Sequence, residues 1–219
     1  MADDRTASVF ALPPSAIARY MRMGREVPKG ALAERIADLR GQALKVLRPA
    51  RVWMRVELPL AVESRALARH LAGCASAYLV CGTIGAELDA LQRRVAVTSG
   101  ADALIVQAIG AAAIEAWMDA VEDEIRLELE PGETLVSRFS PGYGDLPLFL
   151  QDDILKVTDA GRRLGVQAAA SHLLIPSKTV TAVIGISDIP QQARIRGCTY
   201  CALRESCSLR KGGKSCEGQ

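Results

Sequence analysis

Residues 138–148 of this 219-residue chain have the types and spacing best suited to ligand binding. They read Arg-Phe-Ser-Pro-Gly-Tyr-Gly-Asp-Leu-Pro-Leu, and two prolines with two glycines in so short a stretch exclude regular structure. Pro141-Gly142 is a turn dipeptide in which glycine adopts a positive φ. Arg138 offers paired donors for a carboxylate, and Tyr143 offers a ring for stacking and a hydroxyl. The segment therefore suits a small polar ligand with a carboxylate and a flat heterocycle; the alternative is a plain solvent-exposed turn.

A carboxylate upstream is the candidate partner of this segment. The apolar stretch 101–128 predicts the longest helix of the chain, capped by Ser99 or Asp102. Acidic residues interrupt the stretch, which favours a buried helix over a membrane-spanning one. Glu115 stands among alanines, Ile114 and Trp117, so we expect it at the edge of the buried face. A carboxylate there needs a cationic or donor partner unless it is simply solvated.

The second group of chemically active residues is at the C-terminus. Four of the six cysteines lie in the last 22 residues with the spacing C-x2-C-x5-C-x8-C, namely Cys198, Cys201, Cys207 and Cys216. Such clustering does not resemble a disulfide framework. Two thiolates in C-x2-C can share a metal and two more can complete a tetrahedral site, so zinc or an iron–sulfur cluster is a candidate ligand. Free or redox-active thiols are the alternative.

The hydrophobic pattern predicts an α+β fold in which flanking helices cover an antiparallel sheet. The last two strands are expected to form a hairpin, and His70 is expected to point outward from its helix. In the strand 51–60, alternation places Val52, Met54, Val56 and Leu58 on the buried face. The expected helices cover 16–23, 29–47, 64–71, 86–95, 101–128 and 151–164, and the expected strands cover 51–60, 77–83, 134–139, 166–174 and 179–186.

Bulk composition narrows the class of protein. The net charge of +2 and an aromatic content of 4% do not favour a nucleic-acid-binding surface. The N-terminal residues 1–5 are acidic and form no apolar run, so they do not resemble a signal peptide. We therefore expect a cytoplasmic protein with no membrane association. Its predicted organisation is one domain over residues 1–190 and a cysteine-rich basic tail over 191–219.

Taken together, five stretches resemble the activation (reactivation) domain of vitamin B12-dependent methionine synthase, in a free-standing form. The resemblance covers roughly residues 10–190. Its most specific parts are the R-x-x-P-G-Y element and the P-S-K-T-V segment. The stretches are Leu-Ala-Gly-Cys at 71–74, Gly-Thr-Ile-Gly-Ala-Glu at 82–87, Ala-Ala-Ala-Ile-Glu-Ala at 111–116, Arg-Phe-Ser-Pro-Gly-Tyr at 138–143 and Ile-Pro-Ser-Lys-Thr-Val-Thr-Ala-Val-Ile-Gly at 175–185.

The resemblance implies an α+β fold with a twisted antiparallel sheet that binds S-adenosylmethionine. By motif, Arg138 would take the carboxylate of the methyl donor, and Glu115 its amino group. The backbones of Ser140 and Gly142 would bind polar groups in the turn that contains Pro141. Tyr143 would pack against the donor and face the corrin ring of a partner.

The resemblance also implies a reaction, the reductive methylation of cob(II)alamin that a corrinoid protein presents. The partner would be a methionine synthase or a related corrinoid methyltransferase, and a flavodoxin-like protein or a ferredoxin would supply the electron. The sequence contains no homocysteine, folate or cobalamin module, so we expect a component acting in trans rather than a complete methyltransferase. The alternatives are a non-catalytic corrinoid-protein adaptor or chaperone, and a thiol or iron–sulfur electron donor acting through the cysteine tail.

Overall fold

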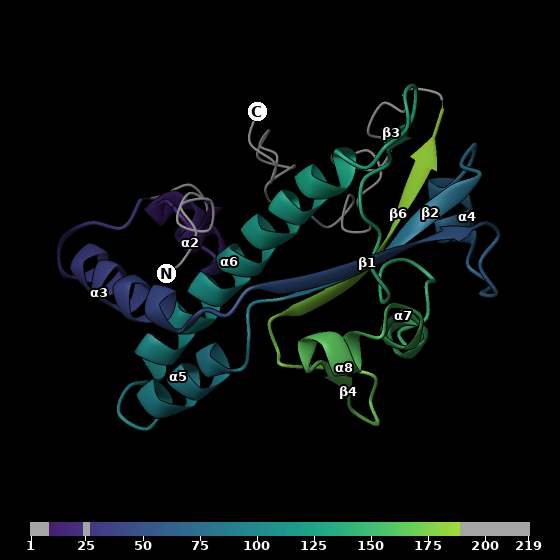
Figure 1. Cartoon of the computed structure of the whole chain (residues 1–219). Coiled ribbons are helices and arrows are strands. Elements are labelled where there is room, and N and C mark those ends of the chain that lie inside the picture. Colours follow the sequence, from purple (N-terminus) through teal and green to yellow (C-terminus); the bar gives the residue numbers. More distant parts are fainter. Residues whose placement is uncertain (1–8, 24–26, 189–219) are drawn as a thin grey trace.

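The fold is α+β: a four-stranded antiparallel sheet with helices on both faces (Figure 1). The structure is a computed structural model that describes residues 9–23 and 27–188. In chain order its elements are α2 (Pro14–Tyr20), α3 (Gly30–Val46), β1 (Ala50–Glu57), α4 (Arg65–His70), β2 (Ser76–Thr83), α5 (Glu87–Ala96), α6 (Gly100–Arg126), β3 (Thr134–Leu135), α7 (Leu150–Thr158), α8 (Ala160–Leu164), β4 (Gln167–Ala168), β5 (Leu174–Ile175) and β6 (Thr179–Ser187).

The two long central strands, β2 and β6, hold the sheet together. The strand order is β1-β2-β6-β3, and β2 pairs along its whole length with β1 on one side and β6 on the other. Every residue of β2 is buried, because helices cover both faces of the strand. Tyr78 and Val80 pack toward α6, whereas Ala77 and Leu79 pack toward α4 and α7. A continuous apolar run of this kind is typical of a strand buried on both faces.

On one face, α6 forms the centre of the larger core together with α2, α3 and α5 (Figure 1). Ser99 caps α6, since its side chain accepts a hydrogen bond from the amide of Asp102. Gly82 lets the helix approach β2, because a Cβ at this position would overlap the sulfur of Met118. By length and composition alone α6 could cross a membrane, but 61% of its most apolar 18-residue stretch is buried within the fold. It therefore serves as the core helix that the sequence predicts.

The opposite face carries α4 and α7, which form a smaller core, and α8, whose Ala160 packs in a separate small cluster with Val52 and Cys81. Phe139 and Leu146, from the segment between β3 and α7, pack there with Leu150 and Ile154 of α7 and with Val183 of β6. Phe139 also forms an isolated antiparallel bridge with Val183. The predicted strand 134–139 is therefore a two-residue strand followed by this single bridge. Both contacts fix the segment that carries Arg138 against the middle of the sheet.

Three predictions about local structure are wrong. The strand 179–186 does not form a hairpin with 166–174: β6 lies in the main sheet between β2 and β3, and the hairpin joins β4 to β5. A β-branched strand with both faces buried is stabilised more by pairing with a strand on each side than by one short hairpin. The predicted helix 151–164 is split at Asp159, where φ is 54°. His70 does not point outward but is only 5% exposed.

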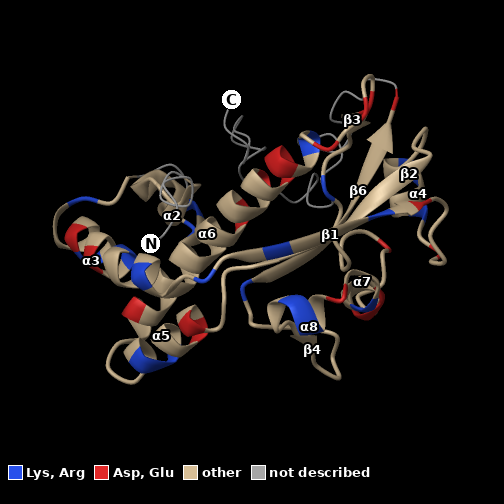
Figure 2. Cartoon of the chain, in the orientation of Figure 1, with Lys and Arg blue, Asp and Glu red and all other residues tan. Residues whose placement is uncertain are grey.

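A row of polar contacts attaches the edge strand β1 to the C-terminal part of α6 and to the segment that follows it. Arg51 pairs with Glu124, the Trp53 indole donates to Glu128 at 2.9 Å, and Arg55 makes two hydrogen bonds to Glu133. Val52 points to the other side and is buried, and Val56 and Leu58 are half-buried against the smaller core, but Met54 is 42% exposed, so the predicted alternation fails at Met54. Basic and acidic segments are mixed throughout the fold, and α6 is acidic toward its C-terminal end (Figure 2).

Candidate functional site

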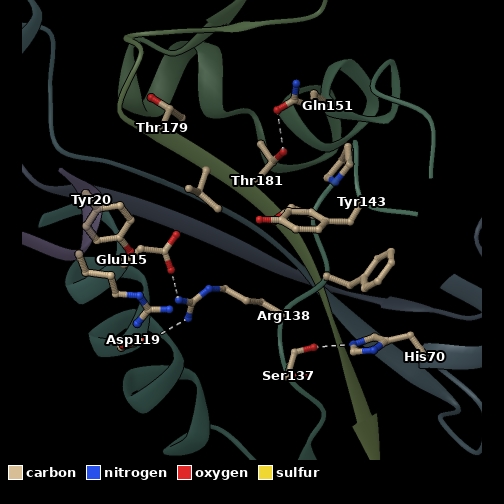
Figure 3. Close-up of a pocket in the computed structure, with 15 residues that line it drawn as sticks. Tyr20, His70, Glu115, Asp119, Ser137, Arg138, Tyr143, Gln151, Thr179 and Thr181 are labelled. Carbon is tan, nitrogen blue, oxygen red and sulfur yellow. Dashed lines mark hydrogen bonds and ion pairs between the residues drawn. The ribbon is translucent and has the colours of Figure 1, made fainter. Parts of the chain in front are cut away.

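A cleft of about 840 Å³ opens where α2, α6, β6 and α7 meet the segment 137–143 (Figure 3). Its wall contains five of the six residues predicted to bind a ligand, and Gly142 lies inside the same turn. The Tyr20 ring lies toward the guanidinium end of the Arg138 side chain, and the Tyr143 ring lies toward its backbone end. The lining residues are Arg19, Tyr20, His70, Glu115, Asp119, Ser137, Arg138, Phe139, Ser140, Pro141, Tyr143, Gln151, Thr179, Val180 and Thr181.

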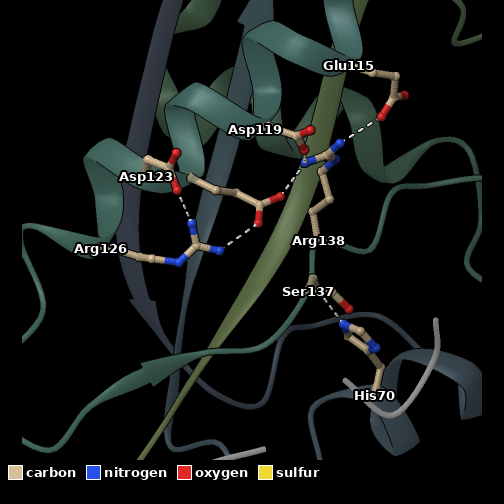
Figure 4. A network of polar contacts seen from close by, with 8 residues as sticks. His70, Glu115, Asp119, Asp123, Arg126, Ser137 and Arg138 are labelled. Carbon is tan, nitrogen blue, oxygen red and sulfur yellow. Dashed lines mark hydrogen bonds and ion pairs between the residues drawn. The ribbon is translucent and has the colours of Figure 1, made fainter. Parts of the chain in front are cut away.

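Arg138 is bound by three carboxylates from one face of α6. Its Nη2 donates to Glu115 at 2.6 Å, and its Nη1 donates to Asp119 at 2.7 Å and also to Glu122 (Figure 4). These acids are spaced i, i+4 and i+7, so they lie along one side of the helix. Burial would lower the pKa of Arg138, but the hydrogen bonds from Asp119 and Glu115 and the charge of Glu122 outweigh it and raise this pKa. The guanidinium is thus firmly held in its charged form.

The three carboxylates differ sharply in exposure. The Glu122 side chain is 5% exposed, whereas those of Glu115 and Asp119 are 48% and 64% exposed. Glu122 also accepts a hydrogen bond from Arg126 at 3.4 Å, so it is shared between two guanidiniums (Figure 4). A buried carboxylate depends on such partners, while an exposed one can exchange them for water or a ligand. Glu122 is therefore the fixed anchor of Arg138, and Glu115 and Asp119 are the partners that face the cleft.

The turn after Arg138 has the shape that its sequence predicts. Gly142 has a φ of 92°, a conformation that favours glycine, and its amide donates to the carbonyl of Leu146 at 2.9 Å. The Tyr143 amide donates to the Ser140 carbonyl at 3.2 Å. Hydrogen bonds within the turn therefore already engage the Gly142 amide and the Ser140 carbonyl. The Tyr143 ring, in contrast, is 67% exposed and packs at 6.3 Å from the ring of Phe139.

Both ends of the short helix α4 form hydrogen bonds with the segment that contains the turn. Asp145 accepts hydrogen bonds from the Ser64 hydroxyl and from the amides of Arg65 and Ala66, and these contacts hold the pKa of Asp145 at about 2. At the other end of α4, His70 Nε2 lies 2.5 Å from the Ser137 carbonyl, and its ring packs 4.9 Å from Phe139. Asp145 thus serves as a helix cap rather than as a ligand contact.

Two further walls come from parts of the chain far from the turn. On α2, Arg19 and Tyr20 face the cleft. On the other side, Thr181 of β6 donates to the side-chain oxygen of Gln151 on α7, whose amide nitrogen donates to the His172 carbonyl. Burial raises the pKa of Tyr20, and the charge of Glu115 raises it further. A ligand here would meet aromatic rings, hydroxyls and charges of both signs.

The sequence predicted Glu115 and the turn as ligand-binding residues, but it did not predict the other residues that line the cleft. Asp119 and Glu122 could have been found, because they continue the helical spacing that starts at Glu115. Arg19 could not, because only the tertiary position of α2 brings it to the cleft. The predicted metal ligands Cys198, Cys201, Cys207 and Cys216 lie outside the described residues. Within 9–23 and 27–188, no group of three or more histidine, cysteine or acidic side chains is arranged to hold a metal ion.

The sheet order and the cleft beside its central strand define an α+β domain whose fold occurs among solved structures. One match is the crystal structure of the MetH reactivation domain bound to AdoHcy, with a TM-score of 0.53 and 15% identity over 95% of this chain and 85% of that one. The chain therefore has the reactivation-domain fold that the sequence resemblance predicts. No family model matches the sequence, and no curated protein matches it.

Proposed function

We propose that this chain binds S-adenosylmethionine in the cleft beside Arg138 and acts as a reactivation module for a corrinoid protein. The proposal is supported by two observations that agree, one on the site and one on the fold. The residues that the motif selects line one cleft, and the fold is similar to a reactivation domain described as bound to AdoHcy. AdoHcy and S-adenosylmethionine share an adenosine and an amino-acid group and differ by one methyl group on sulfur.

The size and charge of the cleft support this ligand. Small-molecule sites typically measure about 300–1,000 Å³, and the cleft has about 840 Å³. The donor carries an ammonium and a sulfonium, both cationic, and the half-exposed carboxylates of Glu115 and Asp119 suit such groups. The exposed ring of Tyr143 can stack on a flat heterocycle. The ligand carboxylate requires a cation, and two guanidiniums line the cleft, those of Arg19 and Arg138.

The proposed role is to present a methyl group, not to perform chemistry with the chain's own side chains. The bond between sulfur and the methyl carbon would break, and a bond between that carbon and the partner's cobalt would form. One electron from a flavodoxin-like protein or a ferredoxin would reduce the cobalt first, and AdoHcy would remain as the product. Tyr143 lies at the open side of the cleft, where an incoming corrin ring could pack against it.

Titration calorimetry with S-adenosylmethionine on the full chain tests the binding step. We expect saturable binding by the wild type and about 5- to 150-fold weaker binding by Tyr143→Ala, since base–aromatic stacking contributes about 1–3 kcal/mol. This variant removes an exposed ring, so the fold should be unaffected. Arg55→Ala is the matched control, because it removes a well-paired arginine outside the cleft and should leave affinity unchanged. No heat of binding by the wild type, with or without a corrinoid protein, would sink the proposal.

One observation favours a second candidate, a corrinoid-protein adaptor that does not use the donor. The two terminal nitrogens of Arg138 are already occupied by Glu115, Asp119 and Glu122, as in a site that needs no ligand to be complete. Incubation with methyl-labelled S-adenosylmethionine and a reduced corrinoid protein separates the two functions. A reactivation module transfers label to the cobalt, whereas an adaptor docks without transfer.

A further inference from the structure

Among the described residues, two guanidiniums line the cleft, and only that of Arg138 is paired with a described carboxylate. Both terminal nitrogens of Arg138 bind carboxylates, and its side chain is 13% exposed. Arg19 is exposed, and it makes no ion pair with any residue in the described ranges 9–23 and 27–188. A ligand carboxylate at Arg138 would have to displace Glu115 or Asp119 and would remain beside both negative charges. A ligand carboxylate at Arg19 would not have to displace a carboxylate of residues 9–23 or 27–188.

The position of Arg19 is fixed by the packing of α2. The two preceding residues, Ile17 and Ala18, are fully buried, and α2 packs on α6. The chain closes the helix at Met21, whose amide donates to the carbonyls of Ile17 and Ala18. Arg19 and Tyr20 therefore leave the helix on the side that forms the wall of the cleft. An anchored backbone with a free guanidinium is a suitable arrangement for capturing an anion.

The Tyr20 phenol interacts with all four charges of the described wall. Burial raises the pKa of Tyr20, the negative charges of Glu115 and Asp119 raise it further, and the positive charges of Arg19 and Arg138 lower it. Coulomb interactions weaken with distance and are screened by salt, so Arg19 belongs to the same cluster as the other three. The cluster thus offers two half-exposed carboxylates and one guanidinium without an ion pair to residues 9–23 or 27–188, which matches the two charges of a zwitterionic amino-acid group.

We propose that Arg19, not Arg138, binds the carboxylate of the ligand's amino-acid group, while Glu115 and Asp119 bind its ammonium. Arg138 is then a positioning residue that holds these two carboxylates in place. The inference rests on the proposed function and adds to it a second recognition element from the N-terminal part of the chain. It also changes the role of Arg138 that the sequence motif implied.

Paired ligands test the assignment directly. S-adenosylmethionine and decarboxylated S-adenosylmethionine differ by the carboxylate alone, so calorimetry with both isolates its contribution. We expect the wild type to bind the complete ligand more tightly. Arg19→Ala should weaken binding of the complete ligand about 10- to 100-fold and leave binding of the decarboxylated ligand unchanged, because a hydrogen-bonded charge pair has about that worth. Arg19→Lys should restore part of the loss.

The controls separate failure of this inference from failure of the proposed function. Arg93→Ala, an exposed arginine on α5 outside the cleft, should bind both ligands as the wild type does. Equal losses for both ligands in Arg19→Ala, or no loss for either, would overturn the role of Arg19. So would a preference for the complete ligand that survives in Arg19→Ala but disappears in Arg138→Lys. A wild type that binds neither ligand refutes the proposed function itself.

Discussion

At the scale of single residues, the three carboxylates around Arg138 have different roles, and exposure separates them. Glu122 is 5% exposed and contacts both Arg138 and Arg126, so its charge depends on the protein for compensation. Glu115 is 48% exposed and can be solvated when it leaves Arg138. Removing one partner of a buried pair leaves an uncompensated charge, whereas exposed pairs contribute little. We therefore expect Glu122 to serve stability, and we propose that Glu115 serves binding.

Charge removal at these two positions should show the difference. We expect Glu122→Gln to lower the free energy of unfolding by about 1–3 kcal/mol, because a hydrogen bond between charged groups is lost in a buried place. Glu115→Gln should change it by less than about 1 kcal/mol but weaken binding of S-adenosylmethionine. Urea unfolding followed by calorimetry measures both. If Glu115→Gln were the more destabilising of the pair, the division of roles would be wrong.

The residue-level predictions from the sequence succeeded where the signal was local. The positive φ of Gly142 and the exposed Tyr143 follow from turn chemistry, and Glu115 has the cationic partner that its place on the helix demanded. That this partner is Arg138 could not be predicted, because the contact spans 23 residues and depends on how the segment after β3 packs on the sheet. Tertiary packing, not local pattern, also decides that Arg19 reaches the cleft.

At the scale of elements, α4 controls the geometry of the binding turn. Its N-terminus is capped by Asp145, which follows the turn, and its last residue, His70, contacts the carbonyl of Ser137, which precedes it. Gly144 lies so close to the helix that a Cβ there would be 2.8 Å from Ala66. His70 Nδ1 is buried without a hydrogen-bond partner within the described part of the chain. The contact between His70 and the Ser137 carbonyl is therefore compatible with a neutral imidazole.

Protonation of His70 should weaken the packing of α4 against the turn segment and so lower the stability of the fold. Burial lowers the pKa of His70, and the hydrogen bond to Ser137 offsets this only in part. The unfolded chain then binds the proton more readily than the folded one, so stability falls as the pH drops below about 6.5. We expect His70→Phe to flatten the decline in unfolding free energy between pH 7.5 and pH 5. Asp145 does not contribute in this range, since its pKa is about 2. Identical pH profiles for the variant and the wild type would contradict this role.

Most elements could be predicted from periodicity, but the partners of the strands could not. The patterns predicted α6, α5 and β2 almost to the residue, because each is long, or clearly amphipathic, or uniformly apolar. The β6 strand was predicted too, but assigned to the nearest strand in sequence. Its real neighbours, β2 and β3, lie far away along the chain, and strand pairing at that range leaves no local signal.

At the scale of the whole molecule, the described wall of the cleft comes from residues 19–181. Its lining residues run from Arg19 to Thr181, and all of them fall inside the predicted 1–190 domain. The predicted tail, 191–219, carries the candidate metal ligands and lies outside the described residues. We therefore predict that the domain and the tail are separable in function, with ligand binding in the domain.

Truncation tests this division. A chain that ends after Asp188 should bind S-adenosylmethionine within about twofold of the full chain, since it retains every lining residue found in the described part of the chain. The same truncation should remove any zinc or iron that the full chain binds when it is purified without oxygen, as metal analysis and a visible spectrum would show. A large loss of affinity on truncation would mean that the tail belongs to the site.

The cleft joins the two ends of the domain, because one wall is the helix α2 and another is the strand β6. A ligand that touches both would act as a non-covalent crosslink between segments more than 150 residues apart (Arg19 and Thr181). By mass action, ligand at 100 times its dissociation constant stabilises the folded state by about 2.7 kcal/mol. Short helices at chain ends open locally more easily than core strands. Binding would then slow amide hydrogen exchange most in α2. The bound methyl donor would itself hold this wall of its site in place.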